Sequence, residues 1–361
     1  MKGLNGKVQA NRTKALKPGP LTAAAFFNRG LTHGIKGQYA KAIADFTRAI
    51  KLDPKDATAY QNRGAAYQLK SDYDKAISDF TEALKLDPKL ATVYIHRGTA
   101  HGLKGEYDRA IADFTSAIKL DPTFALAYYN RGLACNDKGE CAKAITDFTS
   151  AIKLDPNLAA AYHTRGTAFT NNGDYDQAIA DFTKAIKLDP QDAGSYHNRG
   201  RAYYHKEQCD KSIADFTSAI ELNPDYAASY IHRGSAYGLK GDYDKAIADF
   251  TTMIKLEPTN AVAFHQRGLA YDSKDEHDKA LADYTTATEL DPEYALAYFS
   301  LGLAFSLKDE YADAIAAFNR AIDLDPQHAD AYYSRGLAYH AKGDNGQAEA
   351  DFDMAKELGY K

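Results

Sequence analysis

Histidine is the residue type whose placement in this sequence could support chemistry. His163, His197 and His265 occupy one place in a pattern that recurs every 34 residues, and His96 and His232 occupy the next place along. Imidazole can bind a metal, move a proton or donate a hydrogen bond near neutral pH. A metal needs several imidazoles at ~2 Å from one ion, whereas equivalent places in adjacent helix pairs lie about 10 Å apart. The spacing therefore favours pH-sensitive hydrogen-bond donors over a metal site.

The other reactive side chains form no catalytic pattern. The sequence contains no glycine-rich phosphate-binding motif, no H-E-x-x-H and no C-x-x-C. Its carboxylates recur at helix starts in unit after unit, whereas a catalytic pair would be unique in the chain. Cys135, Cys141 and Cys209 stand where other units have aromatic residues, so we expect small buried apolar side chains. The sequence predicts a protein that is not an enzyme and that uses no cofactor and no metal.

An internal repeat carries all of these side chains. The stretch Ala57–Leu90 nearly matches the chain again after each shift of 34 residues. Nine prolines keep this interval without a break: Pro54, Pro88, Pro122, Pro156, Pro190, Pro224, Pro258, Pro292 and Pro326. Ten glycines do the same, from Gly30 to Gly336. A fixed period of this length indicates stacked structural units, each of which contacts only its neighbours.

Each unit is expected to form two helices joined by a tight turn. Tyr60, Gly64 and Tyr67 recur at helical spacing in the first half of the second unit. Acidic residues open the second half and Lys85 lies near its end, which suits the helix dipole at both ends. Pro88 then ends the second helix, because its ring clashes within a continuing helix. The predicted fold is all-α, with antiparallel helix pairs.

This pattern resembles the tetratricopeptide repeat. The resemblance rests on seven residues of the second unit at the family's spacing: Tyr60, Gly64, Tyr67, Ala76, Phe80, Ala83 and Pro88. It covers ten units, which start near residues 23, 57, 91, 125, 159, 193, 227, 261, 295 and 329. It implies a right-handed α-solenoid, a superhelix of helix pairs with a concave groove that binds peptides. The chain departs from the family before the glycine, where nine units have Arg and the family commonly has Leu.

The arginine before the glycine recurs together with an aspartate in the second half of the unit. Nine units carry both residues, and three examples are Arg63 with Asp79, Arg97 with Asp113 and Arg165 with Asp181. The ninth unit lacks both and carries Leu301 and Ala317 instead. Because the partners vanish together, we expect a partly buried ion pair that joins the two helices of a unit. Arginines that bind an anionic ligand are the alternative interpretation.

The resemblance places the wall of the groove on the first helix of each unit. It uses the two residues before the arginine, the residue after the glycine, and residues toward the helix end. None of the twenty residues in the pair before the arginine is permanently charged, although 26% of the chain is charged. Amides, imidazoles and aromatic rings there can hold an extended peptide. The candidate groove residues are Asn28, Asn62, His96, Tyr129, Asn130, His163, His197, Asn198, His232 and His265.

The alternative interpretation of this strip is that it packs helices together. If the strip instead lines a groove, the predicted function is a protein–protein interaction scaffold that binds an extended or helical segment of a partner. The basic clamp that the family uses for acidic C-terminal motifs is absent, because Lys never stands two residues before the arginine. The competing function is a structural element that associates end to end through its uncapped last unit.

Residues 1–22 differ in composition from the ten units of residues 23–361. They carry five basic residues and no acidic residue, so the rest of the chain carries −10 within a net charge of −5. Pro18, Gly19 and Pro20 mark the boundary, and we expect a disordered basic leader before it. The net charge predicts neither a nucleic-acid nor a membrane partner. The lack of a secretion signal and of a long apolar run predicts a cytoplasmic location.

Overall fold

The computed structural model describes residues 22–360, which form twenty α-helices and no strand. The first helices of the repeats are α1 (Ala23–Ile35), α3 (Ala57–Leu69), α5 (Ala91–Leu103), α7 (Ala125–Asp137), α9 (Ala159–Asn171), α11 (Ala193–His205), α13 (Ala227–Leu239), α15 (Ala261–Asp272), α17 (Ala295–Leu307) and α19 (Ala329–Ala341). The second helices are α2 (Tyr39–Leu52), α4 (Tyr73–Leu86), α6 (Tyr107–Leu120), α8 (Cys141–Leu154), α10 (Tyr175–Leu188), α12 (Cys209–Leu222), α14 (Tyr243–Leu256), α16 (His277–Leu290), α18 (Tyr311–Leu324) and α20 (Asn345–Glu357). The predicted all-α fold of antiparallel helix pairs is confirmed. The expected leader lies outside the described residues except for Thr22.

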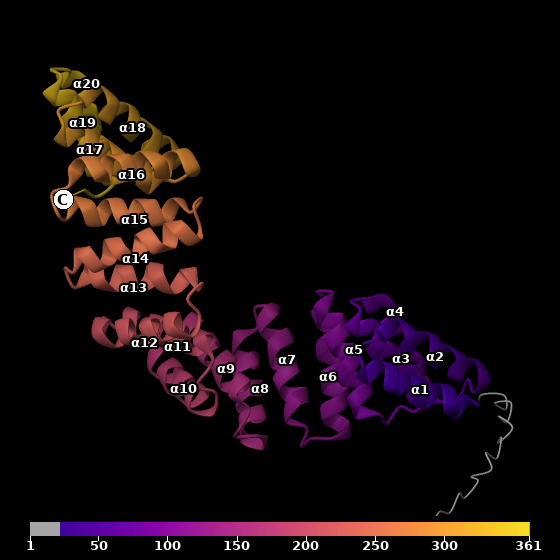
Figure 1. Cartoon of the computed structure of the whole chain (residues 1–361). Helices are drawn as coiled ribbons and strands as arrows, with labels where there is room; N and C mark the ends of the chain where they lie inside the picture. The colour runs from indigo at the N-terminus through magenta and orange to yellow at the C-terminus, as the bar shows by residue number, and fades with distance from the viewer. Residues whose placement is uncertain (1–21, 361) are drawn as a thin grey trace, which may run out of the picture. The chain divides into compact units, whose positions relative to one another are not determined.

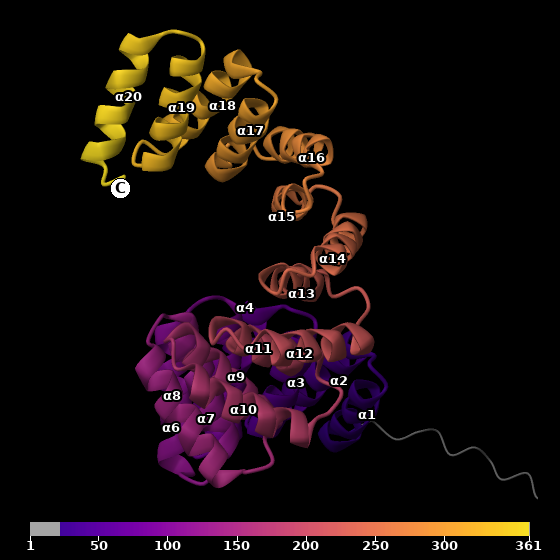
Figure 2. The same ribbon diagram turned by 90° about the vertical axis from the view of Figure 1, so that its left-hand side faces the viewer.

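The helices belong to two compact units, Met1–Ala161 and Tyr162–Lys361. In the first unit each helix from α1 to α8 packs against the next along the chain, and successive first helices also touch one another. In the second unit the same packing runs from α10 to α20, and Figure 1 shows α13 to α16 stacked in chain order. Figure 2 shows the same succession for α17 to α20. Within each unit the first helices therefore form one face and the second helices another.

Residue type accounts for where the helices begin and end. Asp56 precedes α3 and accepts hydrogen bonds from the N–H groups of Thr58 and Ala59 at 2.9 and 3.2 Å. The turn between the helices of the first repeat contains Gly37 at φ 69°, a left-handed conformation that suits glycine. Four repeats place another residue there at φ 58–59°: Ser71, Glu207, Asp275 and Asp309. These four turns are strained in a way that the glycine turns are not.

We expect Ser71→Gly to stabilise the first unit. Ser71 is exposed and its side chain has no hydrogen-bond partner among the described residues, so little is lost with it. A left-handed backbone costs a residue other than glycine about 1 kcal/mol, so the free energy of unfolding should rise by about that amount in urea titrations. Ser78→Gly, at an exposed site inside α4, is the matched control and should lower stability by ~0.5–1 kcal/mol. An S71G protein no more stable than its parent would contradict this interpretation of the turn.

Close contact between glycine and an aromatic ring fixes the two helices of each repeat. A Cβ added to Gly64 would lie 2.7 Å from a ring carbon of Phe80, which is nearer than atoms can approach. Ala76 lies on the facing helix and is fully buried. The same glycine–aromatic contact recurs from Gly30 with Phe46 to Gly336 with Phe352. Each first helix is therefore held against its second helix and turns its opposite side outward.

Candidate partner-binding site

Arginine–aspartate pairs join the two helices of nine repeats. In the third repeat Arg97 donates from Nε and Nη2 to the two carboxylate oxygens of Asp113, at 2.9 and 2.7 Å. The nine pairs are Arg29–Asp45, Arg63–Asp79, Arg97–Asp113, Arg131–Asp147, Arg165–Asp181, Arg199–Asp215, Arg233–Asp249, Arg267–Asp283 and Arg335–Asp351. All nine aspartates are buried, with exposed fractions of 3–6%. The hydrogen bonds with Asp113 raise the pKa of Arg97, so this arginine stays charged.

The arginines also connect neighbouring repeats, which the sequence analysis did not predict. Arg97 Nη1 donates to Thr81 Oγ1 of the preceding repeat at 3.2 Å. The same bond joins Arg63 to Thr47, Arg131 to Thr115, Arg199 to Thr183, Arg233 to Thr217 and Arg267 to Thr251. Three helices thus meet at one guanidinium group, whose donors face protein acceptors. This arrangement favours a structural role over the binding of an anionic ligand.

Seven residues at the first place of the predicted groove pack inward. These residues stand two places before the arginine or its equivalent. The centroid of each ring lies 5.4–5.9 Å from the centroid of the core aromatic ring of the same repeat. They are Phe27, Tyr129, His163, His197, His265, Phe299 and Tyr333. At this place the packing interpretation of the strip therefore accounts for the side chains better than an open groove does.

His197 and His265 do not line an open groove, which corrects the sequence-based expectation. Both are buried, and His197 Nδ1 lies 2.8 Å from Ser229 Oγ. His265 bonds with Tyr294 Oη at 2.9 Å and with Ser300 Oγ at 3.0 Å. Burial lowers the pKa of His197 to about 3 and that of His265 to about 4. These imidazoles are neutral packing groups whose hydrogen bonds are used inside the protein.

The second place of the predicted groove stays nearer the surface. His96 and His232 are half-buried and stack on Phe80 and Phe216, and burial lowers the pKa of both imidazoles. The asparagines at the equivalent places are exposed (Asn28) or half-buried (Asn62, Asn130 and Asn198). Asn62 donates to the carbonyl oxygen of Thr58 at 2.8 Å. The side chain of Asn130 has no hydrogen-bond partner among the described residues, so its amide can bond to another chain.

Large apolar side chains are exposed further along the first helices of the first unit. Ile35, Leu69 and Leu103 occupy the same place in three consecutive repeats, and their exposed fractions are 89%, 63% and 57%. Leu31, Ala65 and Leu133 lie one turn earlier on their helices and are half-buried. We call the surface formed by Leu31, Ile35, Ala65, Leu69, Leu103 and Leu133, together with Asn62 and Asn130, the apolar strip.

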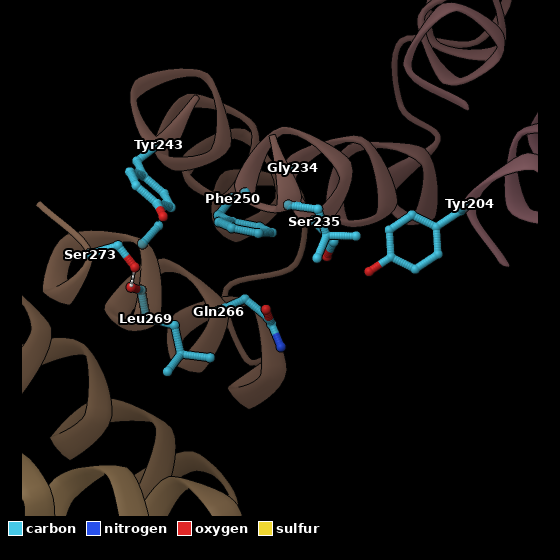
Figure 3. Close-up of a pocket in the computed structure, with 11 residues that line it drawn as sticks. Tyr204, Gly234, Ser235, Tyr243, Phe250, Gln266, Leu269 and Ser273 are labelled. Atoms are coloured by element: carbon cyan, nitrogen blue, oxygen red, sulfur yellow. Dashed lines mark hydrogen bonds between the residues drawn. The ribbon is translucent and has the colours of Figure 1, made fainter. Parts of the chain in front are cut away.

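Three equivalent pockets open between adjacent first helices. In the first unit one pocket of about 200 Å³ lies between α1 and α3 beside Gly34, and another of about 160 Å³ lies between α5 and α7 beside Gly102. A third, of about 320 Å³, lies between α13 and α15 beside Gly238 in the second unit. Figure 3 shows this third pocket, with Phe250 and Tyr243 on one side and Gln266 and Leu269 on the other. The core aromatic ring forms part of the lining in all three.

A second glycine lies beside each of these pockets, four residues after the glycine that packs against the core aromatic ring. Gly34, Gly102 and Gly238 are the residues at this place in their repeats, and the other seven repeats have larger residues there. A Cβ at Gly34 or Gly238 would meet nothing within 4 Å, so neither glycine is needed for close packing. These pockets were not predicted from the sequence, although the glycine that interrupts the repeat was a signal that could have found them.

The cysteines and the remaining ionisable groups do not add to a reactive site. Cys135 is buried as expected, whereas Cys141 and Cys209 are only partly buried, which corrects the expectation for these two. Burial raises the pKa of the Cys135 thiol and so disfavours the reactive thiolate. Residues 22–360 contain no group of three His, Cys, Asp or Glu side chains that could hold a metal ion. No helix in this part of the chain is long and apolar enough to cross a membrane.

These features define a helical-repeat protein that exposes apolar side chains on several of its first helices. The chain belongs to the tetratricopeptide repeat family. A family model described as TPR repeat matches residues 35–71, 103–135, 132–173, 166–206, 200–241, 271–309 and 305–343. Models described as tetratricopeptide repeat match residues 57–90, 227–260 and 329–358. Proteins of this family mediate protein–protein interactions.

Two solved structures show the same fold. The APC/C hetero-tetramer Cut9-Hcn1 is similar at 17% identity, with a TM-score of 0.51 over 93% of this chain and 73% of that chain. A tetratricopeptide repeat protein from Parabacteroides merdae is similar at 20% identity, with a TM-score of 0.52 over 69% of this chain and 98% of that chain. No curated protein matches the chain.

Proposed function

We propose that the chain is a protein-interaction scaffold whose first unit binds an extended segment of a partner along the apolar strip. One observation carries the proposal. Ile35, Leu69 and Leu103 are each more than half exposed at one place on three consecutive first helices. Contiguous exposed apolar surface of this kind is typical of protein-binding sites.

A comparison between repeats separates these side chains from leucines that the fold requires. The last residue of the second helix is also an exposed Leu in the first repeats, as at Leu52 and Leu86, but it is Leu in the first nine repeats, and Leu358 directly follows α20 at the equivalent place of the tenth. At the place of Leu69, by contrast, five other repeats have Asp, Asn, His, Ser or Ala. The fold tolerates polar residues there, so the apolar residues of the first three repeats serve another purpose.

The polar groups of the apolar strip suit an extended backbone. Asn130 presents both its amide N–H groups and its carbonyl oxygen, and Asn62 retains its carbonyl oxygen as an acceptor. Amides beside apolar surface can pair with the main chain of a bound segment while the leucines contact its side chains. Such an arrangement binds a segment by its backbone and by a few apolar anchors.

Replacement of two leucines of the apolar strip by glutamate tests the proposal. Leu69→Glu with Leu103→Glu should leave folding nearly unchanged, because both side chains are largely exposed. Each lost apolar contact is worth about tenfold in affinity, so a partner purified from the source cells should bind the double variant about a hundredfold more weakly. Ser78→Glu with Ala112→Glu places the same charges at equivalent exposed sites on the second helices of the same two repeats and is the matched control.

The outcomes of this comparison are distinct. Partners that are lost with the strip variant and kept with the control support the proposal. Partners that bind both variants alike contradict it. A preparation that captures only further copies of the chain, from either variant, would favour self-assembly over scaffolding.

A further inference from the structure

We infer that the bound segment carries two apolar side chains about six residues apart, one for each pocket of the first unit, and a basic residue beside the second. This inference rests on the proposed function and specifies the chemistry of the partner. The pockets beside Gly34 and Gly102 open on the same face of the first unit, two repeats apart.

The pockets match a single apolar side chain in size and lining. Their volumes are about 200 and 160 Å³, and an apolar cavity of about 150 Å³ accepts a benzene ring. Ile35, Tyr39 and Phe46 line the first pocket, and Leu103, Tyr107 and Phe114 line corresponding parts of the second. A branched aliphatic or aromatic anchor would therefore be desolvated at each end of the apolar strip.

The two glycines keep these pockets open at the expense of helix stability. Glycine inside a helix is less favourable than alanine, yet a Cβ at Gly34 would meet nothing within 4 Å. A Cβ at Gly102 would meet one atom, the Cβ of Ala110, at an ordinary distance of 3.9 Å. Packing therefore does not require either glycine, and what each one provides is an opening beside the core ring.

The spacing of the pockets sets the spacing of the anchors. Packed helices lie about 8–10 Å apart, and the contacts of α1 with α3 and of α3 with α5 place the two pockets about 20 Å apart. An extended chain advances about 3.3 Å per residue, so this distance spans about six residues. An even number of residues also places both anchors on the same side of an extended segment.

Charge distinguishes the two ends of the apolar strip. Asp137 lines the Gly102 pocket, is exposed, and its carboxylate has no partner among the described residues. The residues that line the Gly34 pocket are all uncharged. A lysine or arginine beside the anchor in the Gly102 pocket would pair with Asp137, whereas an acidic residue there would be repelled.

The test selects peptides of about twelve random residues, displayed on phage, on the full chain and on variants with filled pockets. Gly34→Leu and Gly102→Leu place a side chain in each pocket, and Gly346→Leu makes the same change at an open helical site in α20. We expect peptides that bind the parent to share two apolar residues about six apart, with a basic residue beside one. Each filled pocket should weaken them about tenfold or more, while the Gly346 control binds like the parent.

Thermal unfolding separates loss of binding from loss of folding. Leucine is a better helix former than glycine, so the two filled variants should unfold at the same temperature as the parent or higher. Asp137→Asn should weaken only the peptides that carry the basic residue. Selected peptides without the spacing, or with equal affinity for the filled variants, would overturn the inference while the proposed function stands.

Failure of the proposed function gives a different result. If no peptide is enriched, or if peptides bind equally to the strip variant with glutamate at Leu69 and Leu103, both the scaffold and its anchors are contradicted. A synthetic peptide of residues 1–21 serves as a competitor. If it displaces the selected peptides, the chain's own first residues occupy the strip, and the inference of a separate partner fails.

Discussion

Asp113→Ala is expected to lower the free energy of unfolding of the first unit by about 3–5 kcal/mol. Asp113 is 6% exposed and accepts two hydrogen bonds from Arg97, whose side chain is about one-fifth exposed. Removal of the carboxylate leaves a guanidinium group that is shielded from water and bonded only to Thr81. An uncompensated charge in such a place is far more costly than the pair itself is stabilising. Urea unfolding with amide hydrogen exchange in α5 and α6 measures the effect.

The ninth repeat supplies the control for this prediction. It has Leu301 and Ala317 at the two places, and both side chains are buried in an apolar cluster. The double change Arg97→Leu with Asp113→Ala reproduces that pair and removes the buried charge, so it should recover most of the lost stability. A double variant as unstable as Asp113→Ala alone would contradict the account, as would an Asp113→Ala protein as stable as its parent.

Acidification from pH 7 to pH 5 is expected to destabilise the second unit by about 6 kcal/mol. Burial lowers the pKa of His197 to about 3 and those of His232 and His265 to about 4. In the unfolded chain these pKa values return to about 6.5, so below pH 6.5 the unfolded state binds protons that the folded state does not. Stability is therefore complete above pH 6.5 and falls with pH, by about 2 kcal/mol for each histidine by pH 5.

Phenylalanine substitution provides the check on this pH dependence. His265→Phe places at this site the residue that the first and ninth repeats use there, Phe27 and Phe299. The variant loses hydrogen bonds to Tyr294 and Ser300, so its stability at pH 7 should fall. Its further loss between pH 7 and pH 5 should nevertheless be about 2 kcal/mol smaller than that of the parent. An equal loss in both proteins, measured by urea unfolding at the two pH values, would place the titrating group elsewhere.

The helices and the arginine–aspartate contacts could be predicted because both depend on local, repeated residue types. Helical spacing, capping residues and prolines fix each pair of helices without reference to distant parts of the chain. Arg97 and Asp113 could be matched because the ninth repeat lacks both partners at once. The sequence did not predict the bond from Arg97 to Thr81, since it joins two repeats and the threonine does not vary with the arginine: Thr285 remains where the ninth repeat has Leu301.

Side-chain direction on the first helix could not be predicted from composition alone. A strip free of permanent charge is compatible with an open groove and with packing, and His197 turns inward against Phe216. The open surface lies instead about two turns later, at Leu69 and its equivalents. A pocket depends on two adjacent helices and on an absent side chain, so Gly34 and Gly102 stand out in the sequence as interruptions of the repeat, but the pockets beside them were located only once the helices were placed.

Photocrosslinking tests the central claim most directly. The photoreactive residue p-benzoylphenylalanine replaces Leu69 on the apolar strip in one protein and Leu86 on the second helix in another, both exposed sites of the same repeat. We expect a bound partner to be crosslinked through a short segment from position 69 and little or not at all from position 86. Crosslinks from position 86 with none from position 69 would show that partners bind the other face, and would contradict the account.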